Sequence, residues 1–101
     1  MFEYCGAIHV HSTYSDGSGS VPVILNAAHQ SQLDFLILTD HNSLRARAEG
    51  WEGWHGKTLL IVGDEVSGRH GHCLAIGTQQ RVNHRQDHQG ILQDIHRQEG
   101  L

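Results

Sequence analysis

The chain carries the stretch Ile8-His9-Val10-His11-Ser12-Thr13-Tyr14-Ser15-Asp16-Gly17, in which two histidines and an aspartate follow a possible β-strand. Residues two apart in a strand point to the same face, so we expect His9 and His11 side by side, with Cα atoms about 6.6 Å apart. The turn at 15–17 ends in a glycine, which tolerates positive φ, so Asp16 can fold back toward the same strand end. The three side chains form a candidate metal-ligand cluster. The alternative is a pair that arose by chance, or polar residues that only hydrogen-bond at a strand end.

Composition limits the classes of protein to which the chain can belong. Its 101 residues suffice for a single domain. Two apolar runs, at 33–38 (broken only by Asp34) and 59–62, are typical of buried strands, and a disordered chain would lack them. The formal net charge of -4 opposes nonspecific binding to nucleic acid or to an acidic membrane surface. Ten histidines, spread from His9 to His96, favour metal or proton chemistry instead.

Two features bear on the compartment. The two cysteines, Cys5 and Cys73, are too few for a disulfide-dense scaffold. The first residues lack the basic and apolar regions of a secretory signal, and no apolar run approaches the length of a membrane span. We therefore expect a soluble, cytoplasmic protein with no membrane partner.

The expected order of elements is β-α-β-α-β-β-α. Strands are predicted at 7–10 or 7–11, 33–38, 58–62 and 72–76, helices at 21–31, 43–49 and 83–98, and a glycine-rich loop with two tryptophans at 50–56. This order predicts a mainly parallel α/β sheet. Functional groups collect at the carboxyl ends of such strands. The candidates at these ends are His9, His11 and Asp16, then Asp40 and His41, then Glu65, while His72 opens the fourth strand.

Six of these residues form a mixed set of nitrogen and oxygen donors: His9, His11, Asp16, His41, Glu65 and His72. Four imidazoles and two carboxylates suit Zn²⁺, Mn²⁺ or Fe²⁺ better than Ca²⁺ or Mg²⁺. Six donors exceed the needs of one tetrahedral zinc ion, so we expect more than one ion. Glu65 is the natural bridging ligand, because a carboxylate can use both of its oxygens.

Four motifs in this order resemble those of the PHP (polymerase and histidinol phosphatase) domain family. They are His9-Val10-His11-Ser12 with Ser15-Asp16-Gly17, then Thr39-Asp40-His41, then Gly63-Asp64-Glu65, and last His72-Cys73-Leu74-Ala75-Ile76-Gly77. The match covers residues 7 to 77 with spacing similar to that of the family. Four ordered motifs are far more specific than any one of them.

The resemblance implies a distorted, TIM-like (β/α)7 barrel that holds two or three divalent metal ions. It also implies a phosphoesterase in which a metal-bound hydroxide hydrolyses nucleotides or other phosphomonoesters, as a phosphatase or a 5′-3′ exonuclease-like enzyme. Small phosphorylated compounds, nucleotides and short RNA or DNA ends are the implied substrates. His9, His11 and Glu65 would hold the first ion, Asp16 and His41 the second, and Glu65 with His72 the third. Glu65 and Asp16 would then serve catalysis through the bound metals.

The resemblance weakens toward residue 101. The family pattern continues with Ala-His-Pro and Asp-x-His motifs, and this sequence contains neither. A barrel of this type takes roughly 200 residues or more, so we expect residues 1–101 to be the N-terminal part of a PHP domain. An open barrel edge would favour self-association. The alternative function is an incomplete, non-catalytic PHP fragment that binds a metal or a partner.

Several further residues have alternative roles. Asp40 can orient a ligand histidine or cap the following helix. Arg45 and Arg69 lie near strand ends and are candidates for binding a substrate phosphate, with a solvated surface position as the alternative. His72 is preferred to His70 as a ligand, because His70 lies in a glycine-rich loop whereas His72 opens an apolar strand.

Overall fold

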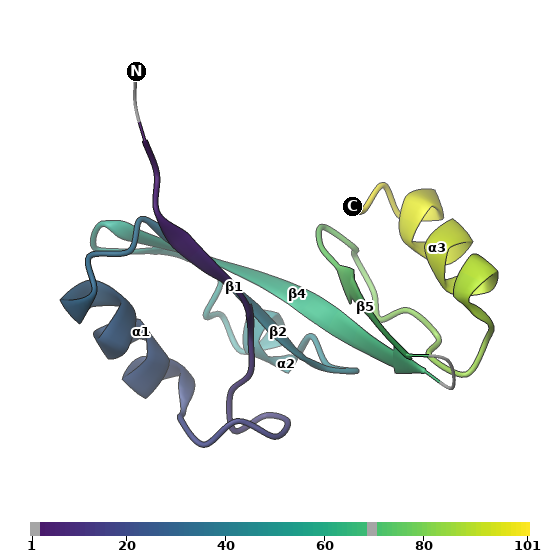
Figure 1. The fold of residues 1–101 in the computed structure, drawn as a ribbon, viewed down its shortest axis with the longest axis horizontal. Coiled ribbons are helices and arrows are strands. Elements are labelled where there is room, and N and C mark those ends of the chain that lie inside the picture. Colours follow the sequence, from purple (N-terminus) through teal and green to yellow (C-terminus); the bar gives the residue numbers. More distant parts are fainter. Residues whose placement is uncertain (1–2, 69–70) are drawn as a thin grey trace.

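The computed structural model describes residues 3–68 and 71–101 as a mixed five-stranded sheet with three helices. The elements, in chain order, are β1 (Gly6–Val10), α1 (Val21–Gln30), β2 (Phe35–His41), α2 (Arg45–Ala48), β3 (Gly53–His55), β4 (Thr58–Gly68), β5 (Gly71–Ala75) and α3 (His88–Arg97) (Figure 1).

Strand β4 is the strand on which the sheet is assembled. The hydrogen-bonded order is β1-β2-β4-β3, and β5 also pairs with β4. Strands β1, β2 and β4 run parallel, whereas β3 and β5 are antiparallel to β4. The sheet is therefore mixed: β1, β2 and β4 form the expected parallel part, whereas the antiparallel pairing of β3 and β5 differs from the expectation of a mainly parallel sheet. Only two residues separate β4 from β5, and a parallel pairing of these strands would need a much longer crossover connection.

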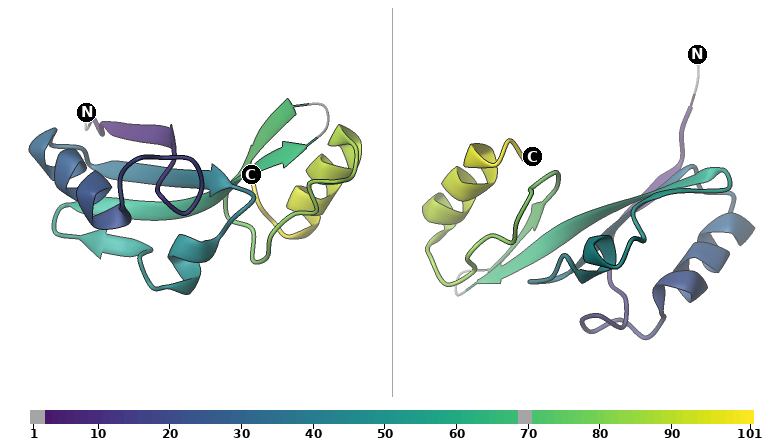
Figure 2. Two further views of the ribbon diagram at one scale, coloured as in Figure 1. Left: turned by 90° about the horizontal axis from the view of Figure 1, so that it is seen from below. Right: turned by 180° about the vertical axis from the view of Figure 1, so that it is seen from behind.

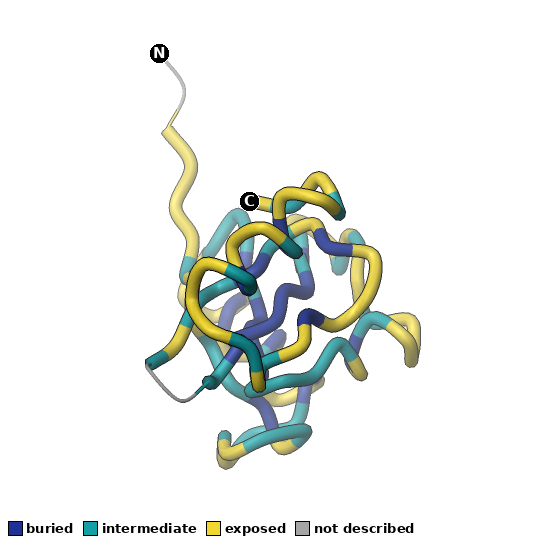
Figure 3. Tube along the Cα trace, turned by 90° about the vertical axis from the view of Figure 1, so that its right-hand side faces the viewer, coloured by how far each residue is buried: buried dark blue, intermediate teal, exposed yellow. Residues whose placement is uncertain are grey.

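One face of the sheet packs against helices α1 and α2. Alternate residues of β2 and β4 supply this core, which consists of Leu36, Leu38, Leu60 and Val62 with Val21, Leu25 and Ala46. A second cluster lies under α3 and contains Val66, Ala75, Val82, Ile91 and Ile95. Figure 2 shows α1 and α3 at opposite ends of the sheet, and the buried segments in Figure 3 run along the central strands.

None of the three described helices covers the other face of the sheet. Phe35, Ile37, Leu59 and Ile61 alternate with the core residues and are only half-buried. The described residues form an open sheet with no closed barrel. His41 and Glu65 lie farther along the same face, because His41 pairs with Glu65 in the register between β2 and β4.

Several predicted boundaries differ from the observed ones. Strand β2 spans 35–41 rather than 33–38, and β4 runs six residues past its predicted end at Val62. The predicted loop at 50–56 contains β3, which pairs with the start of β4. Trp54 in that strand is exposed, whereas Trp51 packs against the core.

The helices also differ in length from the prediction. Helix α1 closely matches the predicted 21–31, but α2 is a single turn at 45–48. Helix α3 begins at His88 rather than at 83, because Asp87 caps it by accepting a hydrogen bond from the Gly90 N–H at 2.8 Å. Within residues 3–68 and 71–101, no helix combines the length and hydrophobicity that crossing a membrane requires.

Candidate metal centre

The carboxylate of Glu65 lies at the middle of a group of four imidazoles. It is almost completely buried, at 2% exposure. Its Oε1 atom contacts Nε2 of His9 and lies 3.0 Å from Nε2 of His11. Its Oε2 atom lies 2.8 Å from Nδ1 of His41 and 3.0 Å from Nδ1 of His72. Residues from three strands or their ends, β1, β2 and β5, therefore converge on one side chain of β4.

The second carboxylate, Asp16, joins two of the same imidazoles from the solvent side. Its Oδ1 atom lies 2.7 Å from Nδ1 of His11, and its Oδ2 atom lies 3.2 Å from Nε2 of His41. The structure thus brings together all six residues singled out in the sequence. Their donor atoms form three groups, each with its atoms within 4.8 Å of one another: His9, His11 and Glu65; His11, Asp16 and His41; and His41, Glu65 and His72.

These groups differ from the expected ligand sets in one respect. His11 belongs to the first and second groups, and His41 belongs to the second and third. The resemblance to the PHP family implied a single ion for each of these histidines. Sharing arises because both nitrogens of each ring face a carboxylate oxygen.

The electrostatic environment keeps the Glu65 carboxyl group ionised. Burial raises its pKa, but hydrogen bonds from His11 and His9 and the positive charge of His41 outweigh burial, so the pKa lies below the ordinary value of 4.5. An ionised carboxylate is the form that binds a cation.

The neighbouring Asp64 points to the opposite face of the strand and behaves differently. Burial raises its pKa above the ordinary value of 3.8, despite a hydrogen bond from the Ser43 N–H and the positive charge of Arg81. Its Oδ2 atom has no hydrogen-bond partner in the described part of the chain.

Asp40 has a role that neither sequence alternative anticipated. Its buried Oδ1 atom accepts hydrogen bonds from the Ser12 N–H and from the Ser15 hydroxyl, both at 2.6 Å, and its Oδ2 atom accepts one from the Ser12 hydroxyl at 2.7 Å. Within the described part of the chain it makes no hydrogen bond to a ligand histidine, and it does not cap α2, whose N-cap is Leu44. Asp40 instead fixes the segment that connects His11 with Asp16.

The geometry of this segment also corrects the argument made for Gly17. Gly17 does not have positive φ; a Cβ atom at this position would collide with the carbonyl oxygen of His11. Close approach of the backbone, rather than the φ angle, requires glycine here. The pairing of His9 with His11 likewise does not follow regular strand alternation, because His9 has φ of 63° and the register shifts between Ala7 and Val10.

Ser67 is a residue of the centre that sequence reasoning missed. Its Oγ atom lies 2.5 Å from Nδ1 of His41 and 2.8 Å from Nδ1 of His72. The available signal was its position two residues after Glu65, on the same face of a strand. That signal was lost because the strand was predicted to end at Val62.

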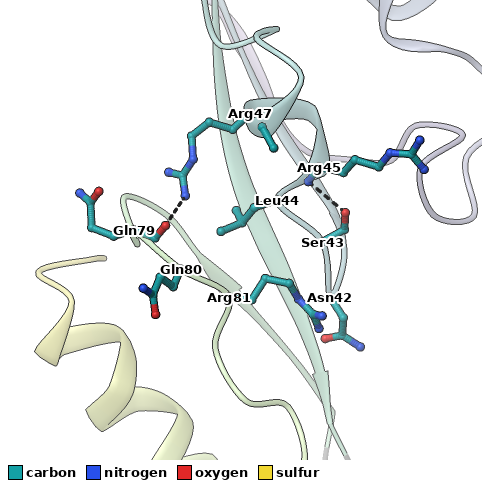
Figure 4. Close-up of a pocket in the computed structure, with 9 residues that line it drawn as sticks. Asn42, Ser43, Leu44, Arg45, Arg47, Gln79, Gln80 and Arg81 are labelled. Atoms are coloured by element: carbon teal, nitrogen blue, oxygen red, sulfur yellow. Dashed lines mark hydrogen bonds between the residues drawn. The ribbon is translucent and has the colours of Figure 1, made fainter.

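The structure does not bring Arg45 to the centre. Arg45 pairs with Glu49, with 2.5 Å between Nε and Oε2, and lies over the ring of Tyr14. Arg69, like His70, falls outside the described residues. Arg47 donates a hydrogen bond to the carbonyl oxygen of Gln79 at 3.1 Å, and it borders an open pocket together with Arg45 and Arg81 (Figure 4).

A solved structure provides an independent comparison for this fold. A two-domain protein from Bacteroides vulgatus ATCC 8482, containing a predicted PHP-like metal-dependent phosphoesterase, aligns with a TM-score of 0.69 and 23% sequence identity. The alignment covers 95% of this chain and 33% of that chain, so this chain spans about a third of that protein's length. No family model matches the sequence, and no curated protein matches it. The likeness shows that the chain has a PHP-like fold.

Proposed function

We propose that this chain contributes the metal centre of a PHP-type, metal-dependent phosphoesterase that hydrolyses phosphomonoesters. The observation that carries the proposal is the convergence of four imidazoles and two carboxylates on one end of a PHP-like sheet. His9, His11 and Glu65 would hold one ion, Asp16 and His41 a second, and Glu65 with His72 a third.

The arrangement of donors at this cluster supports bound cations. Both ring nitrogens of His11, and both of His41, face carboxylate oxygens at 2.7–3.2 Å. The buried carboxylate of Glu65 and the carboxylate of Asp16 thus lie on either side of the same two rings, and divalent cations bound among these donors would balance the negative charge. The nitrogen and oxygen donors suit zinc, manganese or iron.

The ionisation, positioning and exposure of the donor side chains suit the centre to phosphate chemistry. Glu65 stays ionised in a buried position, and Asp40 holds the segment that presents Asp16. His9, Asp16 and His72 have side chains 53–64% exposed, so a phosphate group can reach the donors from solvent. Ions held here would polarise the phosphoryl oxygens and lower the pKa of a coordinated water.

We further propose that residues 1–101 are the N-terminal part of a distorted (β/α)7 barrel. The half-buried residues of the uncovered sheet face would then line the barrel interior, or mediate self-association where that face stays open. Nucleotides, short RNA or DNA ends and other small phosphomonoesters in the cytoplasm are the proposed substrates.

The test combines metal content with turnover of a generic phosphomonoester. The purified chain is loaded with Zn²⁺, Mn²⁺ or Fe²⁺, its metal is measured by mass spectrometry, and hydrolysis of p-nitrophenyl phosphate is followed. We expect Glu65→Ala and His9→Ala to abolish turnover and lower metal content. Glu3→Ala and His96→Ala, which replace the same residue types at exposed positions away from the centre, should change neither.

Two results would contradict the proposal. Turnover that persists at the wild-type rate in metal-loaded Glu65→Ala would exclude this centre as the catalytic site. Full metal retention with no turnover of any phosphomonoester would favour a non-catalytic metal-binding module.

A further inference from the structure

We propose that Arg47 and Arg81 form a phosphate-binding pocket that lies beside the candidate metal centre and is separate from it. The pocket has a volume of about 570 Å³, which is within the range of roughly 300–1,000 Å³ that is typical of small-molecule sites. A phosphate group is small enough to enter it. Binding in this pocket does not require the ions of the proposed function, so the two proposals can be tested independently.

The pocket lies at the carboxyl end of β2, on the helix side of the sheet. Asn42 and Ser43 form part of its wall and directly follow the candidate ligand His41, so the wall begins within about 7 Å of the His41 backbone. The Ser43 N–H donates a hydrogen bond to Oδ1 of Asp64 at 3.0 Å. Because Asp64 and Glu65 point to opposite faces of β4, the pocket and the metal centre lie on opposite faces of the sheet near the same edge.

The lining of this pocket is positively charged, although the chain as a whole is acidic. The sequence has 11 acidic residues, 7 lysines and arginines, and a formal net charge of -4. Four of the basic residues line this pocket or the adjoining one, which shares Arg81 with it: Arg45, Arg47, Arg81 and Arg85. No aspartate or glutamate is among the described residues that line either pocket. A surface of one sign concentrates ions of the opposite sign, so an anion is attracted to this part of the chain.

The arginines that can hold an anion here are Arg47 and Arg81 rather than Arg45. The guanidinium group of Arg45 pairs with Glu49 and points away from the pocket (Figure 4). In the described part of the chain neither Arg47 nor Arg81 forms an ion pair with a carboxylate, although the charge of Arg81 acts on the buried Asp64 from a longer distance. A bound anion would supply the partner that both guanidinium groups lack among these residues.

Hydrogen bonds hold together the elements that carry the two arginines. Arg47 of α2 donates a hydrogen bond to the carbonyl oxygen of Gln79 at 3.1 Å (Figure 4). The Gln80 N–H donates one to Oε1 of Gln98 at 2.8 Å. The loop that carries Arg81 is thus tied to α2 on one side and to the end of α3 on the other. The bond to Gln79 uses one of the five N–H donors of the Arg47 guanidinium group, so the others can bind an anion.

Phosphate is the anion that suits these donors. The planar guanidinium group presents paired N–H donors that match two phosphate oxygens, and such charge-assisted bonds are strong. The phosphate can be free orthophosphate, or it can be a second phosphate group of a molecule whose first phosphate reaches the metal centre. The second source rests on the proposed function, whereas the first does not.

The test titrates the metal-free chain with sodium phosphate at constant ionic strength and follows its ¹H–¹⁵N spectra. We expect saturable shifts of the Nε–H signals of Arg47 and Arg81 and of the backbone signals at 79–81. Arg47→Gln and Arg81→Gln should each weaken phosphate binding by about tenfold or more, as the loss of a hydrogen bond to a charged group does. Lys57→Gln, which removes the same charge at the opposite end of the sheet, should bind within about twofold of the wild type, because distant exposed charges are screened.

Two results would overturn this inference. One is a set of shifts that grow with phosphate concentration without saturating. The other is phosphate binding of equal strength in the wild type and in the Arg47→Gln/Arg81→Gln double variant, once the remaining signals of its spectrum show that the variant is folded.

Two nucleotides distinguish the sources of the phosphate group. In the metal-loaded chain, a lower KM for thymidine 3′,5′-bisphosphate than for thymidine 5′-monophosphate, with the difference lost in Arg81→Gln, would identify a second phosphate of the substrate. Equal KM values together with saturable binding of orthophosphate would identify free phosphate. Absence of turnover with both nucleotides would count against the proposed function, and the titration of the metal-free chain would still decide whether the pocket binds phosphate.

Discussion

The Asp40 carboxylate shows how a residue that does not face the candidate ions can still determine their site. It is buried beneath the segment that joins His11 to Asp16 and accepts three hydrogen bonds from Ser12 and Ser15. These bonds hold the exposed Asp16 side chain in reach of His11 and His41. Glu65 is a second single residue that determines the site, because it is the buried anion that all four imidazole rings contact.

We predict that Asp40→Ala lowers the free energy of unfolding by about 1–3 kcal/mol, because it leaves buried donors without an acceptor. It should also weaken the ion held by Asp16 and His41, while Asp40→Asn, which keeps one oxygen acceptor, has a smaller effect. Urea unfolding and metal titration measure both quantities. The control is Asp94→Ala, whose partner Arg97 is exposed; equal losses in the two alanine variants would disprove the role assigned to Asp40.

At the scale of elements, β4 decides the geometry of the centre. It pairs with β2 along one edge and with β3 and β5 along the other. Gly63 resembles a strand end in the sequence, yet it lies inside β4, where a Cβ atom would come within 2.8 Å of the Ala75 carbonyl oxygen. Close approach of β5, rather than a chain reversal, therefore explains this glycine. The longer strand is what places Glu65 and Ser67 opposite β2 and β5.

The segment after β1 contains two glycines, Gly17 and Gly19, whose replacement by alanine can be compared directly. A Cβ atom at Gly17 would collide with the backbone at His11, whereas one at Gly19 would meet no atom closer than 3.5 Å. We predict that Gly17→Ala displaces Asp16 and weakens the second ion by at least about tenfold, comparable to loss of an outer-shell partner. Gly19→Ala should bind like the wild type. Metal titration compares the two, and similar affinities would show that the loop tolerates the added methyl group.

At the scale of the whole molecule, the candidate centre connects four strands of an otherwise open sheet. Residues at or near β1, β2 and β5 contact Glu65 of β4, although β1 and β5 are not neighbours in the sheet. Ions bound at this point would act as cross-links between chain segments that the two separate apolar clusters do not join. The uncovered sheet face, with its half-buried Phe35 and Ile37, makes such cross-links important for stability.

Removing the metal should therefore lower the thermal stability of the chain. A ligand at 100 times its dissociation constant stabilises the folded state by about 2.7 kcal/mol, so we expect a clear drop in melting temperature after chelation and recovery on adding Zn²⁺ or Mn²⁺. Differential scanning calorimetry measures the change. Glu65→Ala should show no metal-dependent shift, whereas His96→Ala should respond like the wild type; a shift of the same size in Glu65→Ala would place the stabilising ion elsewhere.

The sequence alone determined the identity of the six clustered residues, because their local patterns are specific: His-x-His before a tight turn, and Asp-His and Gly-x-Glu after apolar runs. It also predicted α1 closely, since a proline in the first turn and an apolar period are local signals. Only the tertiary structure decided the length of β4, the role of Asp40 and the presence of Ser67 in the centre. The role of Asp40 and the contact of Ser67 with His41 depend on hydrogen bonds between residues more than twenty positions apart, and no local pattern encodes which distant partner completes them. The length of β4 depends on its pairing with both β2 and β5.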